Sequence, residues 1–306
     1  MKDYVGLAAA LAGLLVLFGA VTDHFLTTAT LRTIASQIPT AVVLATGMTL
    51  VLVVGGIDLS VGSVLALSGA VLGVCLASFQ MTAIGAIAAC LAAGTACGLV
   101  NGIVIVRWRL PAFIVTLGMM EVARGLAYQV TRSQTQYLGD GLDGLTADLF
   151  RGITPAVVMS GIVVAVSQLA LSRTVFGRQV VAIGTNEEAV RLSGIQPAWT
   201  KVAVYAVAGL LAGVGAILHA ARLSAADPNA GTGAELQAIA AAVIGGTSLM
   251  GGRGSVVHTL FGVVIIAVLA SGLSHAGAQE PTKRIITGCV IVAAAILDAY
   301  RHRGMR

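Results

Sequence analysis

The chain has 306 residues, of which 57% are hydrophobic and only 10% are charged, and its mean hydropathy is +0.95. Soluble domains carry about 25% charged residues, so this composition excludes an ordinary soluble protein and predicts a polytopic membrane protein. The net charge of +5 does not indicate nucleic-acid binding, because the basic residues stand singly between apolar blocks.

Apolar stretches that are long enough to cross a bilayer recur along the whole chain. Because a spanning helix needs about 20 apolar residues, the sequence predicts an all-α polytopic membrane protein of about ten transmembrane helices. Residues 1–306 are expected to form one transmembrane domain, and the weakly apolar residues 23–37 a short interfacial helix before Pro39 begins the next span. The expected spans are 4–22 (retained rather than cleaved as a signal peptide), 38–55, 61–79, 82–106, 111–130, 153–171, 201–221, 236–250, 255–273 and 284–300.

The distribution of basic residues predicts the orientation of these spans. An even number of spans places both termini on the same side, and the loops on that side carry more Lys and Arg than the loops on the other side. The positive-inside rule therefore predicts that both termini lie in the cytoplasm. The polar residues 172–200 fall on the same side.

The first polar interruption follows the second expected span. Gly55 and Gly56 end that span, and Asp58 follows as a carboxylate close to lipid depth, with Ser60 placed to cap the next helix. An ionisable residue at this depth is a candidate for a transport path or gate, while the simpler interpretation is a structural turn held by Asp58. A similar pattern of a glycine pair, a polar break and Gly-Ser-Val recurs at 244–256, which suggests an internal duplication or a convergent turn.

Two further sites place charge inside or beside the expected spans. Glu121 and Arg124 are three residues apart and could pair on one helix face or line a polar path. Glu235 opens a span after a glycine turn.

Residues 176–195 form the longest polar interval, and they predict a short amphipathic helix in a cytoplasmic loop. Its signals are a glycine break, a capping residue, an acidic first turn, a basic residue near the end and a glycine stop before Pro197. Ala189, Leu192 and Ile195 could face a partner groove, or the helix could be an ordinary surface element. The residues that carry these signals are Gly184, Asn186, Glu187, Glu188, Ala189, Arg191, Leu192 and Gly194.

The sequence offers no catalytic or metal constellation. The four cysteines lie in apolar segments without metal or disulfide spacing. The glycine cluster around Arg253 lacks the spacing of a phosphate-binding loop. We therefore expect no catalytic residue, no metal and no cofactor on this chain.

Four stretches carry a recognisable pattern: Gly47–Leu50 running into Gly56–Ser63, Pro111–Gly125, Gly177–Arg178 with Asn186–Ala189 and Arg191–Ile195, and Gly231–Gly233 with Glu235–Leu236 to Gly254. Together they resemble the permease subunits of bacterial ABC importers for ribose-type monosaccharides, the ribose, xylose, arabinose and autoinducer-2 group. The sequence departs from the usual pattern at Thr185, Gln237 and His258, and the departures at Gln237 and His258 leave the exact sugar open.

The resemblance implies a ten-helix permease domain similar in fold to vitamin B12-importer permeases, in the bacterial inner membrane. It implies two permeases, as a homodimer or with a close paralogue, two ATPase subunits that carry ATP and Mg²⁺, and one periplasmic sugar-binding protein. It also implies that residues 184–195 are the coupling helix seated in the ATPase. The alternative function is an ion-coupled secondary transporter of a small polar solute, with Asp58 or Glu121 as the ion site; a non-transporting membrane scaffold is a third.

Overall fold

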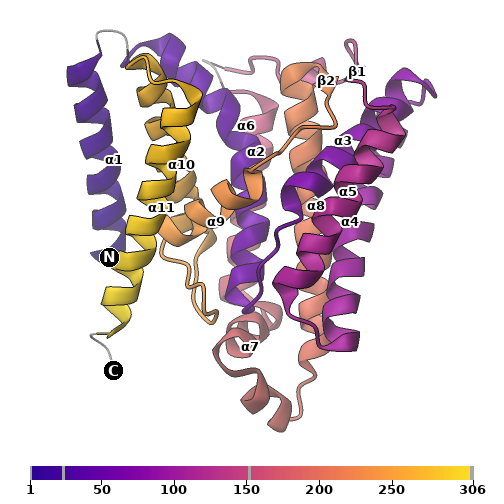
Figure 1. Ribbon diagram of the computed structural model, residues 1–306, viewed down its shortest axis with the longest axis vertical. Coiled ribbons are helices and arrows are strands. Elements are labelled where there is room, and N and C mark those ends of the chain that lie inside the picture. Colours follow the sequence, from indigo (N-terminus) through magenta and orange to yellow (C-terminus); the bar gives the residue numbers. More distant parts are fainter. Residues whose placement is uncertain (1, 23–24, 151–152, 304–306) are drawn as a thin grey trace.

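The computed structural model describes residues 2–22, 25–150 and 153–303, and these residues fold into α-helices with very little other regular structure (Figure 1). A two-stranded antiparallel sheet joins β1 (Gln136–Tyr137) to β2 (Ala225–Ala226), and a single 3-10 turn, η1, covers Asp143–Leu145. The helices are α1 (Lys2–Val21), α2 (Thr28–Val53), α3 (Val61–Ala77), α4 (Ala83–Trp108), α5 (Ala112–Thr131), α6 (Pro155–Arg173), α7 (Val175–Leu192), α8 (Pro197–Leu223), α9 (Ala234–Ile244), α10 (Val256–His275) and α11 (Glu280–Arg303).

The long helices stand side by side as a bundle (Figure 1). By length and composition, α2, α4, α6, α8 and α10 are each able to cross a membrane, and α3, α9 and most of α1 are shorter apolar helices. The prediction of an all-α polytopic membrane protein is therefore confirmed in its coarse form.

Two of the expected spans have the wrong extent. α2 begins after Thr27, whose side chain caps it by accepting a hydrogen bond from the Thr30 amide, and it continues through Pro39 as one helix. The expected separate interfacial helix over 23–37 is therefore wrong, apart from residues 23 and 24, which lie outside the described residues. The expected span 236–250 is also wrong in length, because α9 ends at Ile244 and Gly246 turns the chain with a φ of +81°. At 1.5 Å per residue, α9 is only about 16 Å long, too short to cross a bilayer.

Glycines bring the central helices into close contact. Gly94 and Gly98 of α4 lie against Gly209 of α8, where a Cβ on Gly209 would lie 2.9 Å from the Gly98 Cα. Gly102 continues the same face, and its Cβ would lie 2.8 Å from the Val202 Cα. Small residues allow such backbone approach in a bilayer, where packing rather than the hydrophobic effect holds helices together.

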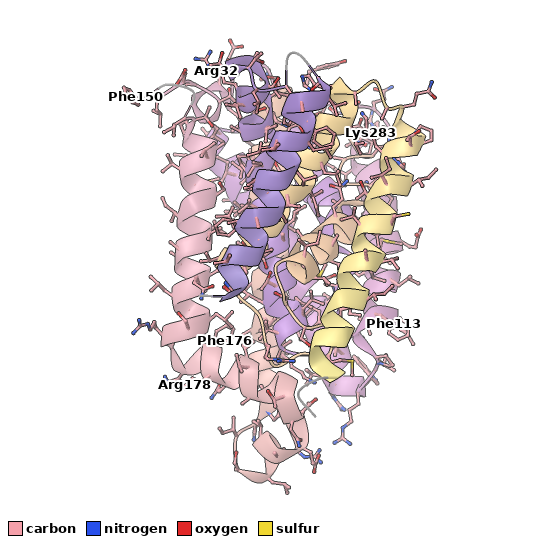
Figure 2. All side chains as sticks on the ribbon, turned by 90° about the vertical axis from the view of Figure 1, so that its left-hand side faces the viewer. Arg32, Phe113, Phe150, Phe176, Arg178 and Lys283 are labelled. Carbon is pink, nitrogen blue, oxygen red and sulfur yellow. The ribbon has the colours of Figure 1, made fainter. Side chains whose placement is uncertain are left out.

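The two ends of the bundle differ. The whole of α7 and the end of α11 lie toward one end, the start of α1 points the same way, and the β1–β2 pair lies at the other end (Figure 1). Phe176 and Arg178 are accordingly far along the bundle from Arg32, Phe150 and Lys283 (Figure 2). The arrangement gives the bundle one end at which α7 projects beyond the other helices, which is called the α7 end below.

Candidate functional site

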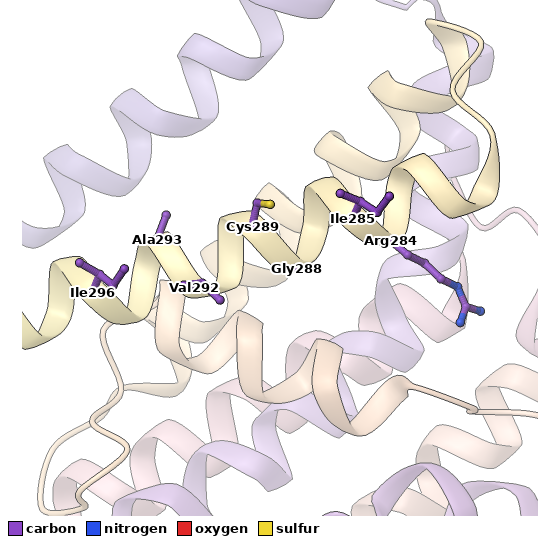
Figure 3. Close-up of a pocket in the computed structure, with 7 residues that line it drawn as sticks. All are labelled: Arg284, Ile285, Gly288, Cys289, Val292, Ala293 and Ile296. Carbon is purple, nitrogen blue, oxygen red and sulfur yellow. The ribbon is translucent and has the colours of Figure 1, made fainter.

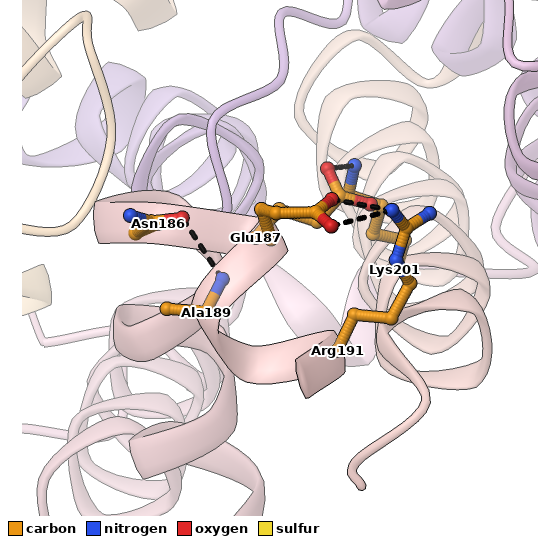
Figure 4. A network of polar contacts seen from close by, with 6 residues as sticks. Asn186, Glu187, Ala189, Arg191 and Lys201 are labelled. Carbon is orange, nitrogen blue, oxygen red and sulfur yellow. Dashed lines mark hydrogen bonds and ion pairs between the residues drawn. The ribbon is translucent and has the colours of Figure 1, made fainter. Parts of the chain in front are cut away.

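α7 is two helical segments joined at a kink. Asn186 has φ −160° and ψ 95°, outside the helical region, and separates residues 175–185 from residues 187–192. Its side-chain oxygen accepts a hydrogen bond of 3.0 Å from the Ala189 amide, which caps the second segment (Figure 4). Gly194, with a φ of +86°, lies just beyond the end. The expected cap and the helix end at Leu192 are confirmed, but the break falls at Asn186 rather than at Gly184.

The charged side chains of the second segment pair with neighbouring residues. Arg191 donates to Glu188 at 2.7 Å, and the hydrogen bond and negative charge of Glu188 raise the pKa of the Arg191 guanidinium. Glu187 forms an ion pair with Lys201 at the start of α8, which ties the projecting segment to the bundle. These pairs lie near the surface, where such pairs contribute about 0–1 kcal/mol.

The apolar side chains at the tip of this segment are exposed. Leu192 is 80% exposed and Ile195 is 39% exposed, whereas Val190 on the other face is 7% exposed. An exposed leucine on a short helix that projects from the bundle offers a contact for a protein partner. The prediction that Ala189, Leu192 and Ile195 face a partner stays a prediction.

The chain between α2 and α3 forms a buried polar turn. Gly55 adopts a φ of +85°, and Asp58 is 2% exposed. One oxygen of Asp58, Oδ1, accepts hydrogen bonds from the Ser60 amide at 2.8 Å and the Ser60 hydroxyl at 2.6 Å. The simpler interpretation, in which Asp58 holds a loop amide, therefore describes a contact that is present.

The expected capping of α3 by the Ser60 hydroxyl is wrong. Ser60 is the N-cap residue of α3, but its hydroxyl makes no capping bond and instead joins Asp58 to Asn101, whose Nδ2 donates to it at 3.0 Å. A buried carboxyl group needs hydrogen-bond partners, because a buried polar group without them costs free energy, and the Ser60 hydroxyl supplies one here. Thr116 of α5 accepts from the Leu59 amide at 3.1 Å on the other side of the turn.

Asn101 and Thr116 were missed in the sequence, although both are fully buried polar residues in apolar helices. Their residue types alone could have identified them, because a polar side chain inside a membrane helix needs a hydrogen-bond partner. The turn that each one supports is far away along the chain and could not be read from local spacing.

The N-terminal ends of α3 and α9 meet near the middle of the bundle. Both helices begin at about mid-height (Figure 1), and a Cβ on Gly231 would lie 2.6 Å from the Gly62 carbonyl oxygen. A Cβ on Gly62 would in turn lie 2.5 Å from the Glu235 carboxylate. Helix N-termini carry partial positive charge and free amide donors, so this meeting point favours oxygen-rich or anionic groups.

Arg124 fixes the segment that leads into α9. Its Nη1 donates to the carbonyl oxygens of Pro228 at 2.6 Å and Ala230 at 2.8 Å. Within the described residues, no ion pair joins Glu121 to Arg124, so the expected pairing is wrong. The arginine satisfies backbone oxygens of an irregular segment, and Glu121 is left exposed on the outer face of α5.

The surface of α11 carries a groove of a different character. A shallow groove of 480 Å³ along α11 is lined by residues of that one helix, mainly apolar ones such as Ile285, Val292 and Ile296 (Figure 3). Its composition suits contact with lipid chains. Within the part of the chain that the structure describes, no group of three or more His, Cys, Asp or Glu side chains could hold a metal ion.

The helical membrane body has chain breaks inside it, which are common in transporters, and a kinked helix that projects from one end, so the fold agrees with the class of membrane permeases. Residues 30–295 match the family described as "Branched-chain amino acid transport system / permease component". The chain is 41% identical over 297 residues to the ribose import permease protein RbsC of Escherichia coli (strain K12), covering 94% of this chain and 91% of that protein. It is also 36% identical over 291 residues to RbsC of Bacillus subtilis (strain 168), covering 93% and 89%.

A relative that is named for a second sugar also matches most of the chain. The L-arabinose ABC transporter permease protein AraH of Azospirillum brasilense is 35% identical over 264 residues, covering 86% of this chain and 78% of that protein. The chain belongs to this family of ABC-importer permease components, as its motifs predicted. It is thus a multi-pass protein of the bacterial inner membrane and a transport component rather than an enzyme.

Proposed function

We propose that this chain forms the translocation path for a ribose-like monosaccharide, delivered by a periplasmic binding protein and driven by ATP hydrolysis in a separate subunit. The meeting of α3 and α9 carries the structural part of this proposal. Irregular backbone at membrane depth is tolerated where it is buried in protein or lines a water-filled cavity. Interrupted helices in transporters mark the substrate pathway.

The chemistry of the meeting point suits a sugar. Glu235 offers carboxylate acceptors beside Gly62, and the ends of α3 and α9 offer amide donors, so both hydrogen-bonding roles that a hydroxyl needs are available. The relatives reported above are named for ribose and L-arabinose, which are both pentoses. A ribose-like monosaccharide is therefore the substrate that we favour.

The exposed face of α5 supports a second permease copy. Glu121 is exposed there between Gly118 and Gly125, and a Cβ on either glycine would meet nothing within 4 Å. A charged residue at the bilayer centre costs about 2.5–3.5 kcal/mol on insertion scales. The cost falls if Glu121 faces a hydrated path that is closed by α5 of a second copy, either identical or a close paralogue.

The projecting α7 end supports a proposal for the orientation and for the partner. In this proposal the ten helices other than α7 are embedded in the membrane, in a fold like that of vitamin B12-importer permeases, and both termini and residues 172–200 lie in the cytoplasm. The segment from Asn186 to Leu192 is then the coupling helix, and the ATPase carries ATP and Mg²⁺. ATP binding that closes the ATPase favours one arrangement of the membrane helices, a shift in populations through differential binding.

Reconstituted transport tests this function. Purified chain, its ATPase subunit and its binding protein are placed in liposomes, and uptake of labelled ribose is measured with competing arabinose. We expect uptake that requires ATP, survives a proton or sodium ionophore, and is reduced by excess arabinose more than by a hexose. Uptake by the chain alone that collapses with the ion gradient would instead support the ion-coupled alternative.

A further inference from the structure

Four glycines from three distant segments meet at the α7 end of the bundle. Gly55 follows α2, Gly184 lies two residues before the kink of α7, and Gly251 and Gly252 follow α9. A Cβ on Gly251 would lie 2.8 Å from the Gly184 carbonyl oxygen and 2.9 Å from the Gly55 Cα. A Cβ on Gly252 would lie 2.5 Å from the Thr185 hydroxyl oxygen. Backbone therefore packs directly on backbone among all three segments, and this cluster is called the glycine joint below.

One hydrogen bond inside the joint links the two chain breaks to each other. The Gly252 amide donates to the carbonyl oxygen of Val53, the last residue of α2, at 2.8 Å. A Cβ on Gly184 would overlap that oxygen and lie 2.5 Å from the Gly252 nitrogen. Gly184 thus sits against both the donor and the acceptor of this bond.

Backbone conformation does not explain the glycine at position 184. Gly55, Gly251 and Gly252 have positive φ values of +85°, +85° and +77°, which other residues rarely adopt. Gly184 has no such φ and lies in a helical segment, where glycine destabilises by about 0.5–1 kcal/mol relative to alanine. The close contact with Val53 and Gly252 is what alanine would disturb.

The glycine joint connects the projecting segment of α7 to the interior of the bundle. The kink at Asn186 is two residues from Gly184, and the capped segment follows it directly. On the other side, Gly55 leads through the Asp58 turn to the start of α3, and Gly251 and Gly252 connect back to the end of α9. Close-packed backbone leaves no compressible side chain between these parts, so displacement of one must displace the others.

We propose that Gly184 is a positioning residue that transmits movement of residues 186–192 to the α2–α3 and α9–α10 connections together. The inference rests on the proposed function, because it takes the 186–192 segment as the part that the ATPase moves. In this arrangement one push at the α7 end reaches the beginning of α3 and the end of α9 at the same time. The interrupted helices then change together and not one after the other.

Gly184→Ala tests the contact, and Gly161→Ala is its matched control. Gly161 also lies inside a helix, but a Cβ there would meet nothing within 4 Å. Both variants are assembled with the ATPase and binding protein in liposomes, and uptake and ATP hydrolysis are measured on the same preparation. We expect Gly184→Ala to assemble and hydrolyse ATP but to lose about tenfold in sugar transported per ATP. Gly161→Ala should stay within about twofold of the parent.

Hydrogen exchange on the unmodified complex provides a second test that does not depend on a variant folding. Amide exchange is compared with and without ATP trapped on the ATPase. We expect residues 54–60, 184–192 and 245–255 to change together on trapping. A change at 184–192 alone, or normal coupling in Gly184→Ala, would overturn the role of the glycine joint while leaving the permease function intact. Failure of the parent complex to use ATP would instead refute the proposed function.

Discussion

Asn186→Ala should weaken binding of the ATPase subunit without unfolding the permease. Asn186 is exposed, and its side-chain oxygen makes one structural contact in the described chain, the 3.0 Å bond from the Ala189 amide. Loss of an N-cap costs about 0.5–2 kcal/mol, typically about 1 kcal/mol. The segment that it caps runs only from Glu187 to Leu192, and helices shorter than about 12–15 residues are marginal without tertiary support.

The size of the effect follows from this contact. If the ATPase binds the helical form, a loss of about 1 kcal/mol in the stability of that form weakens the complex by about fivefold. The upper end of the range for caps gives about thirtyfold. The bundle itself should keep its thermal stability, because the ion pair between Glu187 and Lys201 and the buried Val190 still hold the segment against it.

Titration of the ATPase subunit onto permease in nanodiscs measures this affinity. Asn186→Ser is the matched control, since serine is an equally good N-cap and keeps an oxygen acceptor. We expect Asn186→Ser to bind like the parent and Asn186→Ala to bind several-fold more weakly. If both variants bind with the parent affinity, the capped segment is not the part that the ATPase recognises.

Three further variants test other contacts. Leu192→Ala should change the free energy of unfolding by no more than about 0.5 kcal/mol, because the side chain is 80% exposed, but it should weaken ATPase binding. The control Ile84→Ala, at a position that is 82% exposed on α4, should change neither quantity. An equal loss of ATPase affinity in both variants would show that Leu192 has no special role. Asp58→Asn keeps an acceptor for both Ser60 donors and should retain uptake and melting temperature. Asp58→Ala removes that acceptor and should lower the free energy of unfolding by about 1–3 kcal/mol. Loss of uptake by a stable Asp58→Asn protein would show that the carboxyl group itself is needed. Arg124→Met should lower the melting temperature and slow uptake, because the carbonyl oxygens of Pro228 and Ala230 lose their hydrogen-bond donor. Hydrogen bonds from a charged donor contribute about 1.5–3 kcal/mol each. An unchanged melting temperature and unchanged uptake would refute this role for Arg124.

The features that sequence reasoning recovered are those fixed by near neighbours. The helices follow from apolar runs, and the Asn186 cap involves Ala189, only three residues away. The same logic placed the end of the second α7 segment near Gly194. Each of these signals involves residues within about one helical turn of each other, so it can be recognised in a short stretch of sequence.

The features that it missed are contacts between distant parts of the chain. Arg124 was expected to pair with Glu121 three residues earlier, but its partners Pro228 and Ala230 are more than a hundred residues later. Ser60 was expected to cap its own helix, but it joins Asp58 to Asn101. In both cases a buried polar group found a partner that local spacing does not reveal.

The similarity between residues 54–64 and 244–256 shows what a local sequence pattern can predict and what it cannot. It marked two glycine interruptions, and both are present, but it gave no sign that they touch. The bond from the Gly252 amide to the Val53 carbonyl joins them, and Gly184 lies against that bond. A break in a membrane helix exposes backbone groups that no lipid can satisfy. Here each break supplies a partner for the other, so neither can move far alone without leaving a buried group unpaired. The same pairing that makes the interruptions tolerable in a bilayer therefore makes them move as one unit.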